Sequence, residues 1–329
     1  MRRTRITVFL LTFAAAYVGA MAQDDDPVKI ESSIVRLNVG VVDQRGHPIT
    51  TLDRSQFSIF EDGVKQQITR FEASSAPFSV VMLLDMSGST KSFRANIKLS
   101  AARFLDALAP DDRVAVVEFY SKINLLSDFS AEKFRAAQAI ELANGQGDTD
   151  LYKALQFGLD RLAKERTRRK AIVVLTDGVD TDAKNDDRKV LASKSDAAIS
   201  DAIRPESSEA FNKVLKTADL QGVTIYPLAL PTGDPKRLAD PTPLQFALFD
   251  ASRKRLQLIA DRTGGTLNSI NRLEEMGKLY AIVAADLRTL YTIEYDPAND
   301  KHDGQWRTVK VEVTGTDLIA RSRQGYFAR

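Results

Sequence analysis

The chain has 329 residues with 46 basic and 44 acidic side chains, a net charge of +2, 8% aromatic residues and no cysteine. This composition excludes a disordered, collagen-like or coiled-coil chain, and the length suits one large domain and a small one. The lack of cysteine excludes disulfides, a thiolate nucleophile and cysteine-ligated metal, and the two histidines, both in polar turn-like sequence, nearly exclude the usual zinc sites.

The N-terminus has the pattern of a secretory signal peptide. Three arginines precede an apolar run over residues 6–20, and Ala20-Met21-Ala22 offers small residues for cleavage. We expect residues 1–22 to be removed and the mature protein to be exported, either periplasmic or secreted to the cell surface. Retention as an uncleaved membrane anchor is the alternative. Removing three arginines and no acid gives the mature chain a net charge of −1, so its charge does not favour nucleic acid.

Residues 23–76 are predicted to form an N-terminal β segment. Apolar and polar side chains alternate over residues 34–42, as in a half-buried strand. Two shorter strands, 57–60 and 67–71, are expected to be joined across the turn Glu61-Asp62-Gly63. These strands are too few for a large independent core, and a linker follows them.

Strands and helices alternate over residues 77–290, which predicts an α/β domain with a doubly wound, mostly parallel sheet. Residues 78–84 are uniformly apolar, as expected for a strand covered on both faces. Residues 123–129 are more polar and suit an edge strand. In the predicted helix 97–108, Leu99 is expected to face the core, together with Ala102, Phe104 and Leu108. The other predicted strands are 113–120, 171–175, 223–228 and 266–268, and the other predicted helices are 132–142, 151–163, 208–218, 256–261 and 276–290.

Two polar regions complete the chain. The acid-rich insertion 180–187 is expected to be a solvated loop, because it lacks the glycine and final glutamate of a calcium-binding EF-hand loop. Residues 291–329 return to β alternation, most clearly over 306–313. No segment after the signal is long and apolar enough to span a membrane. We expect the C-terminal strands to pair with the N-terminal ones in one small β module.

Oxygen-bearing side chains cluster at the ends of two predicted strands. Asp85-Met86-Ser87-Gly88-Ser89 follows the apolar strand 78–84, Thr149 lies in a later loop, and Asp177 follows the strand 171–175. With a strand order of 3-2-1-4-5-6, Asp85 and Asp177 would end neighbouring strands at the point where ligands bind in such sheets. Carboxylate, hydroxyl and water oxygens suit Mg²⁺ or Mn²⁺, and two carboxylates leave the ion able to accept an acidic residue of a partner. The alternatives are helix capping by Asp85 and the serines or by Thr149, and a simple turn at Asp177-Gly178.

At these residues the sequence resembles the von Willebrand factor type A family. The metal-ion-dependent adhesion site of that family has a D-x-S-x-S run, a threonine in a later loop and an aspartate in a T-D-G-like turn. The resemblance implies that Ser87, Ser89 and Thr149 are direct or switching ligands, and that Asp85 and Asp177 act directly or through water. Asp148 departs from the family, many of whose members have glycine there.

The flanking segments add a second resemblance. Residues 57–63 and 320–327 are similar to parts of the bacterial exported von Willebrand-related proteins abundant in Acidobacteria, in which the type A domain sits between β segments. This implies a signal peptide at 1–22, a β segment at 23–76, a type A domain at 77–290 and a C-terminal β segment at 291–329.

The residues favour a non-enzymatic, metal-dependent protein-binding module for adhesion or assembly. An alternative is a structural protein of an envelope assembly whose metal only stabilises the fold. A metal-assisted hydrolase is the third hypothesis, but it needs a general base, for which only Asp148 or Asp150 is available.

Overall fold

The computed structural model describes residues 34–45, 47–72, 77–165, 168–194, 199, 202–270, 276–315 and 317–328. The predicted signal peptide, residues 1–22, lies outside the described residues. Within the described part of the chain, none of the helices combines the length and the apolar character needed to cross a membrane.

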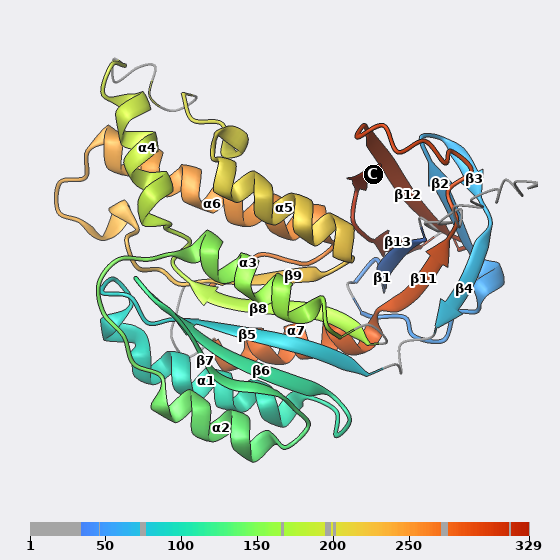
Figure 1. Ribbon diagram of the computed structural model, residues 1–329, viewed down its shortest axis with the longest axis horizontal. Helices are drawn as coiled ribbons and strands as arrows, with labels where there is room; N and C mark the ends of the chain where they lie inside the picture. The colour runs from blue at the N-terminus through green and yellow to red at the C-terminus, as the bar shows by residue number, and fades with distance from the viewer. Residues whose placement is uncertain are drawn as a thin grey trace, which may run out of the picture. The chain divides into compact units, whose positions relative to one another are not determined.

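A six-stranded sheet with the order β10-β9-β8-β5-β6-β7 lies at the centre of the α/β domain (Figure 1). Five strands are parallel, and β7 runs antiparallel at one edge. The bounds are β5 Phe78–Asp85, β6 Arg113–Phe119, β7 Ile123–Ser130, β8 Arg169–Thr176, β9 Thr224–Ala229 and β10 Asn268–Ser269. The predicted doubly wound sheet, its strand order and its edge strand are therefore confirmed.

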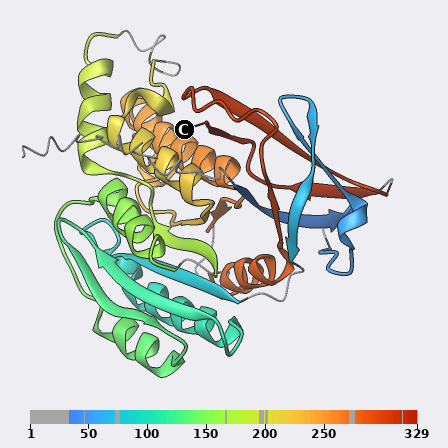
Figure 2. The same cartoon turned by 45° about the vertical axis from the view of Figure 1, so that its right-hand side comes forward.

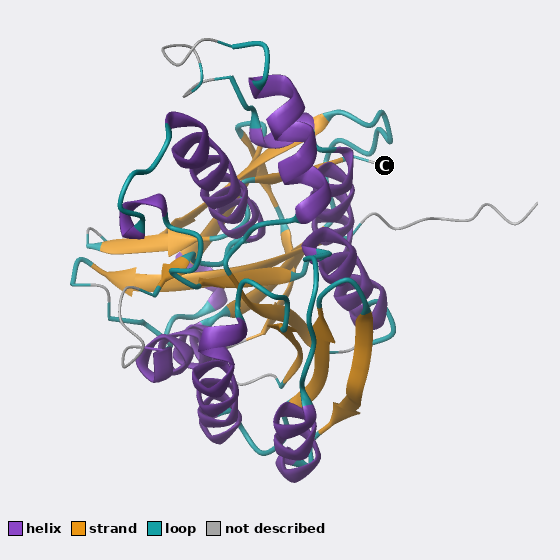
Figure 3. Ribbon diagram, turned by 90° about the vertical axis from the view of Figure 1, so that its left-hand side faces the viewer, coloured by secondary structure: helices purple, strands orange, loops and turns teal. Residues whose placement is uncertain are grey.

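Helices cover both faces of this sheet (Figure 3). One face packs against α1 (Arg94–Ala107), α2 (Lys133–Leu142) and α7 (Met276–Thr289), and the other against α3 (Leu151–Leu162), α5 (Glu209–Gln221) and α6 (Pro243–Thr263). All eight residues of β5 are consequently buried, which explains its uninterrupted apolar sequence. The prediction for Leu99 was wrong: its side chain is 53% exposed, because α1 buries Ile97 and Ala101 and Leu99 lies on the opposite side of the helix.

Two helices differ from the sequence prediction. The acid-rich insertion forms α4 (Thr181–Leu191) rather than a loop, and the side chain of Asp180 caps it by accepting a hydrogen bond from Ala183 N. Helix α6 begins at Pro243, thirteen residues before the predicted start at residue 256, with a capping box between Thr242 and Gln245. The 3₁₀ helices of the described residues are η1 (Arg54–Gln56), η2 (Lys91–Phe93), η4 (Pro205–Ser207) and η5 (Pro235–Arg237).

Strands from both ends of the chain form two further sheets, visible in Figure 2 as blue and red strands that lie together. One sheet has the order β13-β1-β11-β4, with β1 Val35–Asp43, β4 Ile68–Glu72, β11 Tyr291–Tyr295 and β13 Leu318–Arg321. The other has the order β14-β12-β2-β3, with β2 Phe57–Glu61, β3 Val64–Gln66, β12 Trp306–Val313 and β14 Gly325–Phe327.

The two sheets share one apolar core, to which Leu37, Ile59 and Ile293 contribute. The turn Glu61-Asp62-Gly63 joins β2 to β3, whereas β4 pairs with β11 in the other sheet. The predicted pairing across this turn was therefore only partly right, because the chain leaves the hairpin at Gln67. Mixing strands from both chain ends in each sheet gives the short β segments a common core that neither could bury alone.

Candidate metal centre

The parallel sheet brings the two candidate carboxylates together. In the register of β5 and β8, Leu84 is paired with Leu175, so both strands end at the same edge of the sheet, where Asp85 and Asp177 lie. Asp85 is fully buried and Asp177 is 1% exposed. Two carboxylates at this depth need a positive charge or a proton for compensation.

Hydrogen bonds orient both carboxylates. Asp85 Oδ1 accepts from Ser87 N at 3.0 Å, and Asp85 Oδ2 accepts from the hydroxyl of Thr176 at 2.7 Å. Asp177 Oδ1 accepts from Val179 N at 3.0 Å, and Asp177 Oδ2 accepts from the hydroxyl of Thr232 at 3.2 Å. A carboxylate oxygen can accept two hydrogen bonds, so each of the four keeps acceptor capacity for a water or a cation.

The loop that carries Ser87 and Ser89 contacts the loop that carries Thr149. Ser87 Oγ and Ser89 Oγ are 3.2 Å apart, and Gly88 N donates to Gly147 O at 2.9 Å. Gly147 has a φ of +101°, and a Cβ there would lie 2.6 Å from the hydroxyl of Ser121, so the backbone of this loop favours glycine at this position. The backbones of the two loops therefore meet beside the strand ends.

The hydroxyls of the site are not used for helix capping. The N-cap residue of α3 is Asp150, and that of α1 is Phe93. Two hydrogen bonds join Thr149 to Thr181: Thr149 N donates to the Thr181 hydroxyl, and Thr181 N donates to Thr149 O, both at 3.0 Å. The Thr149 hydroxyl itself makes no hydrogen bond within the described residues, so the capping alternatives are not supported. The turn alternative holds in part, since Asp177 does order its own turn through Val179.

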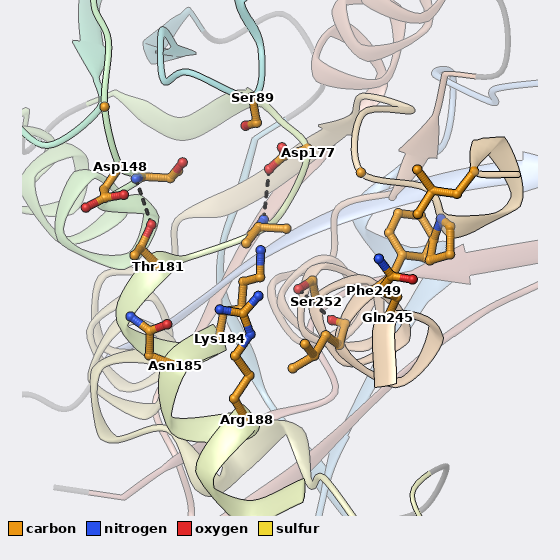
Figure 4. A pocket seen from close by; sticks show the side chains of 17 residues that line it. Ser89, Asp148, Asp177, Thr181, Lys184, Asn185, Arg188, Gln245, Phe249 and Ser252 are labelled. Atoms are coloured by element: carbon orange, nitrogen blue, oxygen red, sulfur yellow. Dashed lines mark hydrogen bonds between the residues drawn. The ribbon is translucent and has the colours of Figure 1, made fainter. Parts of the chain in front are cut away.

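Ser89, Thr149 and Asp177 line a common cavity of about 630 Å³. Figure 4 shows Ser89 and Asp177 close together at one end of this cavity, with the carboxylate of Asp148 lying apart from them. Asp85 and Ser87 are both fully buried and are not among the residues that line the cavity. The structure thus brings the five predicted residues to one edge of the sheet, where three of them line an open cavity.

The donor set fits a hard cation. Among the described residues, no group of three or more His, Cys, Asp and Glu side chains is placed to hold a metal, so any ion here would depend on hydroxyl and water oxygens beside the two carboxylates. Oxygen donors with partial water coordination are what Mg²⁺ and Mn²⁺ prefer. Asp85, Ser87, Ser89, Thr149 and Asp177 are the residues that would hold it.

Burial raises the pKa of the Asp85 carboxyl to about 7, and the nearby charge of Asp177 adds to the rise, while hydrogen bonds from Ser87 and Thr176 oppose it. The folded protein without metal therefore keeps a proton that the unfolded chain loses near pH 4. A bound cation would stabilise the charged form of Asp85 and so offset the free-energy cost of burying its carboxylate.

This pKa predicts how the stability of the metal-free protein depends on pH. Between about pH 4 and pH 7 the folded state binds more protons than the unfolded state, so the free energy of unfolding falls as pH rises, by up to about 1.4 kcal/mol per pH unit. Urea denaturation in EDTA from pH 5 to pH 8 measures this slope. Asp85→Asn, which cannot titrate, should flatten it. An equal slope in the variant would contradict the assignment to Asp85.

Two threonines of the site were given no role by sequence reasoning. Thr176 directly precedes Asp177 in the T-D-G turn, and its hydroxyl binds Asp85 rather than its neighbour. Thr232 lies in the loop after β9, 55 residues beyond Asp177. Thr176 is recognisable as the last residue of a strand beside Asp85, whereas Thr232 has no local signal because only the strand order brings its loop to Asp177.

A family model described as von Willebrand factor type A domain matches residues 80–179. None of the curated proteins compared with the chain matches it.

Several solved structures are similar. The vWF domain of the type V pili tip protein Mfa5 from Porphyromonas gingivalis is 16% identical, with a TM-score of 0.48 over 64% of this chain and 94% of that chain. The von Willebrand factor type A protein from Catenulispora acidiphila is 12% identical, with a TM-score of 0.48 over 92% of this chain and 64% of that one. Proximal thread matrix protein 1 from the mussel byssus, solved with a zinc-occupied MIDAS motif, is 16% identical, with a TM-score of 0.46 over 67% of this chain and 47% of that one. These identities are too low to transfer a function.

The matched residues 80–179 run from within β5 to the turn after Asp177, so they include all five predicted ligands. On this match and on the doubly wound sheet, the chain contains a von Willebrand factor type A domain.

Proposed function

We propose that this protein is an exported, non-enzymatic, divalent-cation-dependent protein-binding module for adhesion or assembly. Asp85, Ser87, Ser89, Thr149 and Asp177 would hold Mg²⁺ or Mn²⁺, and the ion would accept a carboxylate from a partner protein. The proposal includes cleavage after Ala22, a type A domain over residues 77–290, and β segments at 23–76 and 291–329 that pack together. The mature chain would then lie in the periplasm or at the cell surface.

One observation supports this proposal: hydroxyls and carboxylates from three separate loops lie at one edge of the sheet, and Ser89, Thr149 and Asp177 among them line an open cavity. An ion held only for stability would be expected in a closed site, whereas here Ser89 is exposed and lines the cavity together with Thr149 and Asp177. A cation with two carboxylate ligands stays able to attract an anionic oxygen from outside.

A hydrolase is less well supported. The two acids that could serve as its general base are Asp148, whose carboxylate lies apart from Asp177 in Figure 4, and Asp150, which pairs with Lys153 Nζ at 3.1 Å. Neither histidine belongs to the residues lining the cavity. We therefore favour recognition over catalysis.

The test is capture of partners from an envelope extract of the source organism. Immobilised mature protein in Mg²⁺ is expected to retain proteins that EDTA releases and that Asp85→Ala does not retain. If EDTA lowers the melting temperature yet the same proteins stay bound, the ion is structural and the adhesive function is wrong. Metal-stimulated turnover of a hydrolase substrate, lost in Asp177→Ala, would instead establish an enzyme.

A further inference from the structure

One wall of the cavity beside the candidate metal centre is basic. Lys184 and Arg188 lie one turn apart on α4, and both side chains point toward the end of the cavity where Asp177 and Ser89 lie (Figure 4). Within the described residues, neither side chain makes a hydrogen bond or an ion pair. Two cations on one wall without a protein partner leave positive charge facing the cavity.

The acids of α4 do not neutralise these two cations. Three of them pair elsewhere: Asp182 with Lys153 at 3.5 Å, Asp186 with Lys189 at 2.8 Å, and Asp187 with Arg255 at 2.6 Å. Asp180 caps α4 and also accepts from Tyr152 N. The buried pair of Asp187 with Arg255 anchors α4 to α6, while Lys184 and Arg188 remain available on the cavity side.

The positive charge and the volume of the cavity both exceed what a single carboxylate of a partner requires. If a divalent cation balances Asp85 and Asp177, the charged side chains left along the cavity are Lys184, Arg188 and Asp148, so the cavity would keep a net positive charge. The cavity of about 630 Å³ falls within the range of roughly 300–1,000 Å³ typical of ligand pockets and is far larger than a single carboxylate. A second acidic side chain, close to the first along a peptide, would meet both conditions.

We propose that Lys184 and Arg188 form a second anion subsite, so that the partner presents a peptide segment with two acidic residues. One carboxylate would bind the cation, and the other would be held by the planar guanidinium of Arg188 and the ammonium of Lys184. This inference rests on the proposed function, because it assumes that the first carboxylate reaches the ion.

Synthetic peptides test the subsite without knowledge of the natural partner. The probes are fluorescent, acetylated and amidated glycine-rich peptides that carry either one Asp or two Asp separated by one to four residues, measured by anisotropy in Mg²⁺. At the best spacing, the two-acid peptide is expected to bind about fivefold more tightly than the one-acid peptide. This exceeds the factor of about two that a second copy of one ligand provides by statistics alone. In the double variant K184Q/R188Q, this ratio should fall to about two or less.

Lys189→Gln is the matched control, because Lys189 lies on the same helix, pairs with Asp186 and does not line the cavity. It should leave the ratio unchanged, and K184Q/R188Q should not weaken Mg²⁺ binding in calorimetry. The subsite is rejected if the advantage of the two-acid peptide persists in K184Q/R188Q, or if the one-acid peptide binds in Mg²⁺ and no spacing improves on it. If no peptide binds better in Mg²⁺ than in EDTA, the proposed function fails and the subsite fails with it.

Discussion

Asp177→Asn is expected to weaken Mg²⁺ binding by about 100-fold or more. The variant removes one of the two negative charges at the centre, while its side-chain oxygen can still accept the hydrogen bond from Val179 N and so preserve the turn. The loss is large because Asp177 is 1% exposed, and little water is present to replace the missing charge. Isothermal titration with Mg²⁺, repeated with Mn²⁺, measures it.

Asp148→Asn is the control for this measurement. Asp148 belongs to the same cavity and is exposed, but its carboxylate lies apart from that of Asp177 (Figure 4). Its removal should change the Mg²⁺ affinity by no more than about twofold, since an exposed charge is screened by water and salt. Equal affinities of the wild-type protein and Asp177→Asn would refute the proposed centre. A large loss in Asp148→Asn would instead add this residue to the ligands.

Arg255→Met is expected to lower the free energy of unfolding by about 3–5 kcal/mol. Arg255 is 2% exposed and binds Asp187 through the two terminal guanidinium nitrogens, Nη1 and Nη2, at 2.6 and 2.8 Å. The variant leaves the Asp187 carboxylate buried without its partner between α4 and α6. Because domains of this size are stable by only about 5–15 kcal/mol, urea denaturation should detect a large shift in midpoint.

The exposed pair on the same helix provides the comparison. Asp186→Ala breaks the ion pair with Lys189, in which both side chains are more than 70% exposed, and should cost less than about 1 kcal/mol. Replacing both buried partners, in Asp187→Leu/Arg255→Met, should recover much of the lost stability because no charge is left unpaired. A cost below about 1 kcal/mol for Arg255→Met would show that water reaches Asp187 and that α4 is not anchored there.

Sequence periodicity was most informative where local pattern and tertiary environment agree. The apolar run of β5 predicts a strand covered on both faces, and Leu151, Leu155, Leu159 and Leu162 of α3 are all buried as their spacing indicates. The strand order was assumed from the doubly wound class, because no sequence pattern reports it, and the sheet has that order. Leu99 shows the opposite case, in which an apolar side chain in a true helix faces solvent because Ile97 and Ala101 define the buried side.

The acid-rich insertion shows why composition misleads. Its charge density suggests solvent on all sides, yet Asp187 is buried because Arg255, 68 residues later, supplies the matching charge. No local pattern reports such a partner, since the free energy that buries Asp187 comes from the pair. The same packing of α4 on α6 decides that Lys184 and Arg188 face the cavity.

Residues close together in the chain were thus enough to predict the buried strands, most helices and the oxygen-bearing side chains at the strand ends, because hydrophobic periodicity and ligand chemistry are local properties. Only the tertiary structure determines that Thr176 and Thr232 orient the two carboxylates. It also determines that the loop of Gly147 contacts Gly88, and that Lys184 and Arg188 form a basic wall of the cavity. Those features depend on contacts between segments many residues apart. Such segments come together because of the strand order and the helix packing, which no nearby sequence encodes.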